Sequence, residues 1–440
     1  MMTIFGALRV LLFGGLVGGL GLGAFALVDT APRVPAPVPP LAEDASYAHG
    51  LFRKVQEIRY APGLQGELSG NIDEINGLFR LLARAHPELS GRARLEGDRL
   101  VLDMSVAVPR TNGAGWLNLS AVVAPYDARD RGDGFAFESL RVGGITVPSR
   151  AGTAGLRWAL DRRLGDGAGT KMMAALSRMQ VTGEQVVLAV DLSGLPRGNL
   201  SRVTVGDVYG RSMPTLTEVA ANVAEFEAAA AEGRLPVEGS FLPWLRHLLE
   251  VAGTQAGDDP ERALIAGLVA LNYLCGSVHF VPMLLPRVGE GEERLAPPGQ
   301  ACQALTLHDR IDLRRHFLTA ATIKAISDRN PAVVAGEAKE LVDMVHGHFD
   351  FTDIAANNSG IRLATLMLAT PPARWPDLAA AMGAEADVII PLDGIPGEIR
   401  REVFEERFGA VDSPAYTAMM AEIEARIDAL PIHRAAPGGG

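Results

Sequence analysis

The residues best suited to chemistry gather in one stretch, residues 308–361, of a chain otherwise rich in Ala, Leu, Val and Gly. Imidazole and carboxylate groups recur there three and four residues apart, which places them on common helix faces. Such groups can exchange protons when burial and nearby charges adjust their pKa values, and they can also ligate a divalent metal. The predicted catalytic residues are Asp312, His316, Glu340 and Asp353, and the predicted ligand-binding residues are Glu337, Lys339, Asp343 and Asn357.

Three consecutive helices, over 308–328, 331–346 and 352–369, are expected to carry these residues as polar stripes that meet when the helices pack together. Two alternatives stand beside a catalytic or ligand-binding site. The stripes can form a divalent-metal site, although the sequence has no HExxH, no CxxC pair and no calcium loop. They can also form a buried network of hydrogen bonds and ion pairs that fixes helix register. No cofactor is predicted, a divalent metal stays possible, and its ligands are not assigned.

The remaining candidates are weaker. His308, His346 and His348 are expected at the edges of the polar cluster, and His279 in a core or loop. A serine hydrolase triad is poorly supported, because the sequence has no Gly-x-Ser-x-Gly elbow.

Length and charge narrow the class of protein. The chain has 440 residues, which predicts two or three domains. The net charge of −11, without a basic run, argues against a nucleic-acid partner.

The N-terminus predicts export. Arg9 precedes an uncharged run from Val10 to Val28 that is long enough to span a bilayer. We interpret residues 1–29 as a signal-anchor, with a cleaved signal peptide ending near Ala26 as the alternative. The expected location is the inner membrane, single-pass, with the bulk of the chain periplasmic. In that oxidising compartment Cys275 and Cys302 are predicted to form a disulfide, with two buried free thiols as the alternative.

The fold class expected after the anchor is α+β multidomain. A Pro-rich linker (30–46) should lead into an α+β domain (47–193) with a curved antiparallel sheet and helices on one side. A second linker (194–214), an all-α domain (215–432) and a disordered tail (433–440) should follow. In the α+β domain we expect a helix over Ser69–His86 and strands over 93–95, 100–108, 116–123, 135–142 and 185–192. In the all-α domain, Asp259, Asn330 and Ser413 each precede a proline and are predicted helix caps.

Two resemblances add expectations. The segments NIDEINGLF, GWLNLSAVV and LRVGGITVP give residues 65–193 a loose resemblance to YpmS-like and tubular lipid-binding domains. That resemblance implies a sheet wrapped round a helix with a groove for acyl chains; a plain structural domain, used for spacing or partner contact, is the alternative.

The second resemblance covers residues 308–361. The patterns Asp312-x-x-x-His316-Phe317, Gly336-x-x-Lys339-Glu340-x-x-Asp343 and Phe351-x-Asp353-x-x-x-Asn357-x-x-Gly360 resemble YfiM-like envelope proteins and, more distantly, VanZ-like membrane proteins. The resemblance implies a role at the cell envelope and carries no settled reaction.

Together these observations predict a membrane-anchored extracytoplasmic protein of cell-envelope maintenance. Its sheet domain would bind an envelope lipid or an envelope protein, and its helical domain would carry the polar site. One alternative is an extracytoplasmic hydrolase acting on an envelope lipid or glycan, with His316 as base, oriented by Asp312 or Asp353, and Glu340 as acid or metal ligand. The other is a structural scaffold with a buried polar network. Whether the chain is an enzyme is left open.

Overall fold

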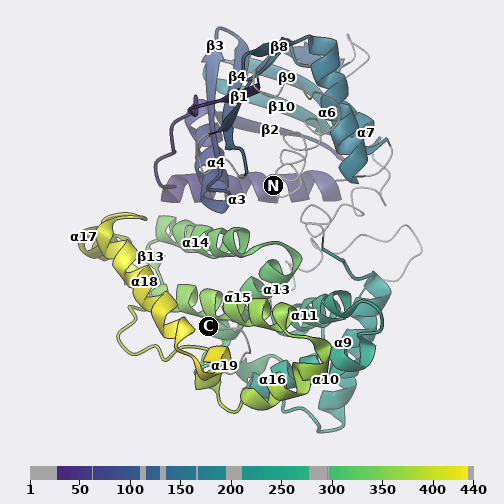
Figure 1. Cartoon of the computed structure of the whole chain (residues 1–440), viewed down its shortest axis with the longest axis vertical. Coiled ribbons are helices and arrows are strands. Elements are labelled where there is room, and N and C mark those ends of the chain that lie inside the picture. Colours follow the sequence, from purple (N-terminus) through teal and green to yellow (C-terminus); the bar gives the residue numbers. More distant parts are fainter. Residues whose placement is uncertain are drawn as a thin grey trace. The chain divides into compact units, whose positions relative to one another are not determined.

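The computed structural model describes residues 27–61, 63–109, 115–128, 135–164, 167–194, 211–276, 295 and 297–434. The chain divides into two compact units, Met1–Leu200 and Ser201–Gly440, which we describe separately. The first unit combines antiparallel sheets with helices and the second is mainly helical (Figure 1), which confirms the mixed α+β class.

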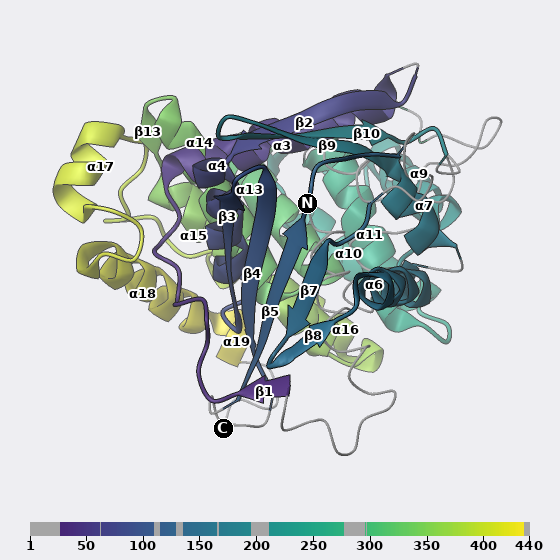
Figure 2. The same cartoon turned by 90° about the horizontal axis from the view of Figure 1, so that it is seen from above.

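The larger sheet of the first unit is antiparallel (Figure 2) and has the order β3-β4-β5-β7-β8, with β1 paired to β5. The strands predicted over 93–95 and 100–108 lie in a hairpin, in which Glu96 of β3 faces Arg99 of β4 across a turn where Gly97 has φ 63°. The strands are β1 (Val28–Asp29), β3 (Leu89–Glu96), β4 (Arg99–Ala107), β5 (Trp116–Val123), β7 (Ser139–Val142) and β8 (Ile145–Val147).

A second antiparallel sheet, of order β2-β10-β9-β6, replaces the single sheet that was expected. Its strands are β2 (Gln65–Asn71), β6 (Tyr126–Asp127), β9 (Leu176–Thr182) and β10 (Gln185–Asp191). Strand β2 occupies the start of the predicted helix 69–86. Glycines in β2 let helix α3 (Ala42–Tyr60) approach closely, since a Cβ at Gly66 would lie 2.4 Å from Ile58 and one at Gly70 would lie 2.1 Å from Tyr47.

Helix α4 (Ile72–Ala85) packs against both sheets. It begins at Asn71, whose side chain accepts from the Glu74 amide while Glu74 bonds back to the Asn71 amide, a capping box. One face of the helix is apolar, and its residues Ile72, Ile75 and Phe79 pack on a buried cluster drawn from both sheets. The cluster consists of Ala93, Leu100, Val123, Tyr126, Met179 and Val186. Helices α6 (Ser149–Leu164) and α7 (Ala168–Ala175) complete the described part of the unit.

The Pro-rich segment lies against the larger sheet over its first residues. Strand β1 pairs with Trp116 and Leu117 of β5, and Val34 is buried. The Arg33 amide donates to Ser105 Oγ and Asn118 Oδ1, each at 3.0 Å. Residues 28–34 are therefore built into the sheet unit and residues 42–46 belong to α3, although the Pro-rich pattern predicts a linker over 30–46.

In the second unit the helices lie close to their predicted ranges. Predicted caps are confirmed at Asp259 and Ser413, whose side chains accept the amides of Arg262 and Tyr416. The cap predicted at Asn330 is wrong, because α14 begins two residues before the predicted start, at Arg329, and its N-cap is Asp328. The helices are α9 (Leu216–Ala231), α10 (Leu242–Gln255), α11 (Pro260–Cys275), α13 (Ile311–Ile326), α14 (Arg329–Val345), α15 (Phe351–Ala369), α16 (Trp375–Ala381), α17 (Arg401–Phe408), α18 (Pro414–Asp428) and α19 (Pro431–Arg434), with 3-10 turns η1 (Pro372–Arg374) and η2 (Glu385–Asp387).

The second unit also contains short strands, so the expectation of an all-α domain is only partly correct. Strand β11 (Glu238–Ser240) pairs in parallel with β12 (Ala304–Thr306), and β13 (His348–Phe349) pairs antiparallel with β14 (Ile399–Arg400). Strands of two or three residues are too short to show an alternating pattern. A disulfide joins Cys275 to Cys302, with 5.2 Å between their Cα atoms.

Several predictions fall outside the described residues: nearly all of the signal-anchor 1–29, most of the linker 194–214, His279, and residues 435–440 of the tail. The first two residues of the predicted tail, 433 and 434, belong to helix α19, so the disorder predicted for them is wrong. Among the residues that are described, none of the helices is long and apolar enough to cross a bilayer.

Candidate functional site

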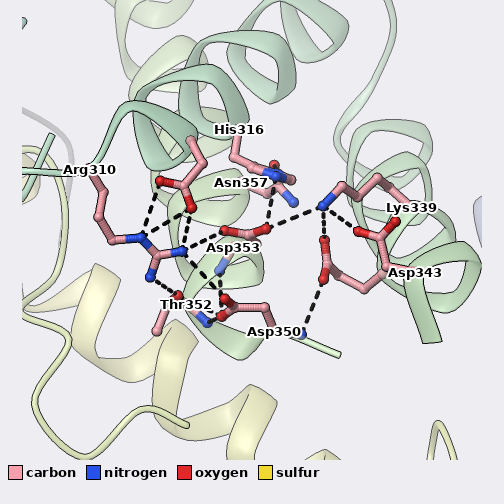
Figure 3. A network of polar contacts seen from close by, with 10 residues as sticks. Arg310, His316, Lys339, Asp343, Asp350, Thr352, Asp353 and Asn357 are labelled. Atoms are coloured by element: carbon pink, nitrogen blue, oxygen red, sulfur yellow. Dashed lines mark hydrogen bonds and ion pairs between the residues drawn. The ribbon is translucent and has the colours of Figure 1, made fainter. Parts of the chain in front are cut away.

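The polar stripes of three helices meet in the second unit (Figure 3). Helix α13 contributes His316, α14 contributes Glu340 and α15 contributes Asp353. One potential ligand atom from each of these side chains lies within 4.8 Å of the others. This convergence is the arrangement that the helical spacing predicts.

Glycines allow the helices to come this close. A Cβ on Gly360 of α15 would lie 2.1 Å from the Phe317 carbonyl oxygen of α13. A Cβ on Gly336 of α14 would lie 2.7 Å from Asn357 Nδ2. Gly360 therefore requires the absence of a side chain, because its neighbour is backbone. At Gly336 the neighbour is the movable amide of Asn357, so a side chain there would displace Asn357.

His316 is held by two residues of α15. Its Nε2 lies 2.9 Å from Asp353 Oδ2, and its Nδ1 lies 3.2 Å from Asn357 Oδ1. Oxygen acceptors therefore face both ring nitrogens. Asp353 and Asn357 are buried, and the His316 side chain is 14% exposed, so the ring lies just below the surface.

Glu340 is the most deeply buried acid of the cluster, with a side chain that is 0% exposed. Its Oε2 accepts the Asp350 amide at 3.1 Å. Its Oε1 forms an ion pair with Lys339 Nζ at 3.1 Å and accepts no well-formed hydrogen bond. Asn357 Nδ2 is likewise buried without an acceptor.

Lys339 lies between three carboxylates. Its Nζ is 2.6 Å from Asp343 Oδ2, 3.1 Å from Glu340 Oε1 and 3.3 Å from Asp353 Oδ2. The Lys339 side chain is 45% exposed, so the cluster opens to solvent on this side.

A tight turn brings Arg310 to the other side of Asp353. His308 and Asp309 both have positive φ, 49° and 59°, a conformation that non-glycine residues rarely adopt. Glu385 Oε2 holds the turn by accepting the His308 amide at 2.7 Å. The Arg310 guanidinium then pairs with Asp312, and it reaches Asp350 Oδ2 and Asp353 Oδ1 at 3.4 Å each.

Asp350 fixes the start of α15. Its side chain caps the helix by accepting hydrogen bonds from the amides of Thr352 and Asp353. The Thr352 hydroxyl donates to the same carboxylate. The helix start that carries Asp353 is therefore anchored to both Glu340 and Arg310.

The pKa values of the two central acids, Glu340 and Asp353, are shifted in opposite directions. Burial raises the pKa of Glu340 to about 7, opposed by the positive charge of Lys339 and reinforced by the negative charge of Asp353. Burial also opposes ionisation of Asp353, but the hydrogen bond with His316 and the charge of Lys339 hold its pKa below the usual range. The surrounding carboxylates outweigh burial and raise the pKa of Lys339, which stays charged and is not a candidate nucleophile.

Six of the eight predicted site residues lie in this cluster, and two lie apart from its centre. Asp312 is half exposed and pairs with Arg310, so it does not orient His316. Glu337 is buried on another face of α14 and accepts a hydrogen bond from Tyr416 Oη at 2.8 Å. Both departures have the same reason: residues three or four apart share a face only approximately, and neighbouring groups decide where each side chain turns.

The edge histidines lie outside the central cluster. The His308 ring contacts the Ile390 carbonyl at 3.1 Å, and His346 Nδ1 contacts the Val342 carbonyl at 2.9 Å. His348 lies in β13. The disulfide between Cys275 and Cys302 is likewise a separate feature of the unit.

Sequence reasoning missed Arg310, Asp350 and Thr352. The signal for Asp350 was present, because an aspartate directly before an apolar helix is a common cap. Arg310 gave no comparable signal, since it reaches the cluster only through the turn at His308 and Asp309.

Comparison with known proteins found no significant match to the chain among protein-family profiles, curated proteins or solved structures.

Proposed function

We propose that the chain is an extracytoplasmic protein of the cell envelope, held at the inner membrane by its N-terminal apolar segment, whose helical unit carries a polar ligand-binding site. The sheet unit would contact an envelope lipid or an envelope protein. The disulfide supports an oxidising compartment, and the apolar run from Val10 to Val28 supports export.

One observation favours a ligand-binding site over a purely structural network. A buried network that serves only stability is expected to satisfy its polar atoms. Here Glu340 Oε1 and Asn357 Nδ2 are buried without a hydrogen-bond partner, next to a half-exposed Lys339. A ligand that enters beside Lys339 can supply the missing partners.

A second candidate is a hydrolase acting on an envelope lipid or glycan, favoured by the contact between His316 and Asp353. Asp353 would hold the imidazole at Nε2. Nδ1, whose contact with Asn357 is the longer of the two, would then take a proton from water once Asn357 turns away.

The test compares His316→Ala and Glu340→Gln with the control Glu337→Gln. Glu337 is a buried acid of α14, the helix of Glu340, and lies outside the cluster. The readouts are the thermal midpoint of each full-length protein and rescue of envelope defects in a strain that lacks the gene. We expect the two site variants to fold with little change in midpoint and to fail in rescue, while Glu337→Gln loses stability and still rescues.

Two results would contradict the proposal. If both His316→Ala and Glu340→Gln fold and rescue fully, the cluster is not the ligand-binding site that we propose. Loss of stability in both, with rescue in proportion to the folded fraction, would make the network structural. For the sheet unit, lipid that co-purifies with the full chain supports lipid contact, and its absence favours a protein partner.

A further inference from the structure

The three central side chains form a donor set for a metal ion. Imidazole nitrogen with carboxylate oxygen suits divalent transition metals. The donors come from three different helices, and the His316 Nε2 to Asp353 Oδ2 distance is 2.9 Å. Ligand atoms bound to one ion at about 2.0–2.2 Å are separated by roughly 3 Å, so this pair already has ligand spacing.

The second ring nitrogen of His316 is placed as in metal-binding histidines. Such residues donate the N–H that does not face the metal to a fixed oxygen, which sets the tautomer and the ring orientation. Asn357 Oδ1 lies 3.2 Å from Nδ1. In the metal-bound form the proton would lie on Nδ1, directed at Asn357, and Nε2, which bonds to Asp353 in the free protein, would turn its lone pair to the ion.

Glu340 supplies an independent observation. Its side chain is 0% exposed, and Oε1 has no hydrogen-bond donor. Buried polar atoms are nearly always paired, and an unpaired one in a native structure calls for an explanation such as an ion. This oxygen shares Lys339 with Asp353 Oδ2, at 3.1 and 3.3 Å. Both oxygens thus face a point that a cation already occupies.

The charge balance favours a further cation. Around Arg310 and Lys339 lie five carboxylates, those of Asp312, Glu340, Asp343, Asp350 and Asp353. Lys339 has a second position available, because its shortest contact is with the partly exposed Asp343 at 2.6 Å. The ammonium can therefore leave Glu340 and Asp353 and keep Asp343.

We propose that His316, Glu340 and Asp353 bind one divalent transition-metal ion, in exchange with the Lys339 ammonium, and that Arg310 and Asn357 orient the ligands from outside. The inference deepens the site of the proposed function by naming its cofactor class. It does not depend on His316 acting as a base. An ion with three protein ligands keeps positions for water or for an oxygen of a substrate.

The test is metal binding to the full-length, disulfide-bonded protein after chelator treatment, with Mn²⁺ and Zn²⁺ alone as probes. Isothermal titration calorimetry gives the stoichiometry and the Kd. The electron paramagnetic resonance signal of Mn²⁺ reports how much of the ion is bound. We expect one ion that is lost or weakened about 100-fold in His316→Ala and Glu340→Gln. We expect Lys339→Met to tighten binding about tenfold, because the competing ammonium is gone.

Glu337→Gln is the matched control and should leave Kd unchanged. Absence of binding in both the unmodified protein and Lys339→Met would overturn the inference, and so would binding that His316→Ala leaves intact. An unchanged Kd in Lys339→Met would overturn the exchange. If no metal binds while His316→Ala still fails in rescue, the cofactor is wrong and the proposed site stands. If metal binds while His316→Ala rescues fully, the metal site stands and the proposed function fails.

Discussion

The contact between α13 and α15 gives the sharpest stability prediction, through the substitution Gly360→Ala. Glycine inside a helix costs about 0.8–1.0 kcal/mol relative to alanine, so local propensity alone predicts a gain. The structure predicts a loss. The added Cβ would lie 2.1 Å from the Phe317 oxygen and 2.9 Å from its carbonyl carbon. Non-bonded carbon contacts lie at about 3.5–4.0 Å, so the helices must separate by about 1 Å.

The magnitude follows from which atoms collide. The neighbour is backbone, so no side chain can rotate away, and the cost falls at the upper end of the usual overpacking range of about 1–3 kcal/mol. Subtracting the propensity gain of about 1 kcal/mol leaves a net loss of about 2 kcal/mol. The same movement would pull Asp353 away from His316, whose contact is 2.9 Å. Rescue by this variant should therefore fall further than its folded fraction.

Gly253→Ala is the matched control. Gly253 lies near the end of α10, and a Cβ there would meet only Trp375, at 3.9 Å, an ordinary contact. It should stabilise the unit by up to about 1 kcal/mol. Urea unfolding followed by the helical circular dichroism signal measures both variants. Equal stability of Gly360→Ala and Gly253→Ala would refute the close packing of α13 on α15.

Three further predictions test other features. In Gly336→Ala the added Cβ would lie 2.7 Å from the movable Asn357 Nδ2. This variant should change stability by less than about 1 kcal/mol yet reduce rescue. Unchanged rescue would count against Asn357 as a positioning residue. Replacing Cys275 and Cys302 by serine opens a loop of 27 residues and should lower unfolding free energy in urea by about 3.5 kcal/mol, so an unchanged midpoint would contradict the disulfide. Burial, with Arg362 nearby, lowers the pKa of His433 from 6.5 to about 4. The folded-state pKa lies below the unfolded one, so this stability is complete above pH 6.5 and falls as the pH drops towards 4. At pH 5 the loss is about 2 kcal/mol, which His433→Leu should remove, and parallel pH profiles for the two proteins would disprove the assignment.

The helices and the centre of the site could be read from sequence because both depend on local spacing. Ile72, Ile75 and Phe79 mark one face of α4, and that face is buried. His316, Glu340 and Asp353 lie on the polar stripes of three neighbouring helices, and those stripes meet.

The rest depends on partners far along the chain. Strand β9 begins at Leu176, directly after the helical residues 171–175 (KMMAA), and becomes a strand through its pairing with β10. Strand β2 contains two glycines, a weak strand pattern, because α3 lies against it. Arg310 joins the site through a turn that Glu385 holds from 77 residues away. Such contacts leave little local trace.

The docking of residues 28–34 on the sheet decides where the protein can be shortened. A shortened form that begins after the prolines, at Leu41, would remove several hydrogen-bond partners of Ser105 and Asn118, which are both 0% exposed and would keep the bond from Ser105 Oγ to Asn118 Oδ1. Asn118 Nδ2 would lose Asp29 Oδ2 at 2.6 Å and the Ala31 carbonyl at 3.0 Å, and Ser105 Oγ would lose the amides of Arg33 and Val34. Orphaned buried groups cost about 1–3 kcal/mol each. A secreted or recombinant version should therefore start at Leu27 or earlier, and one that starts at Leu41 is expected to express poorly and aggregate.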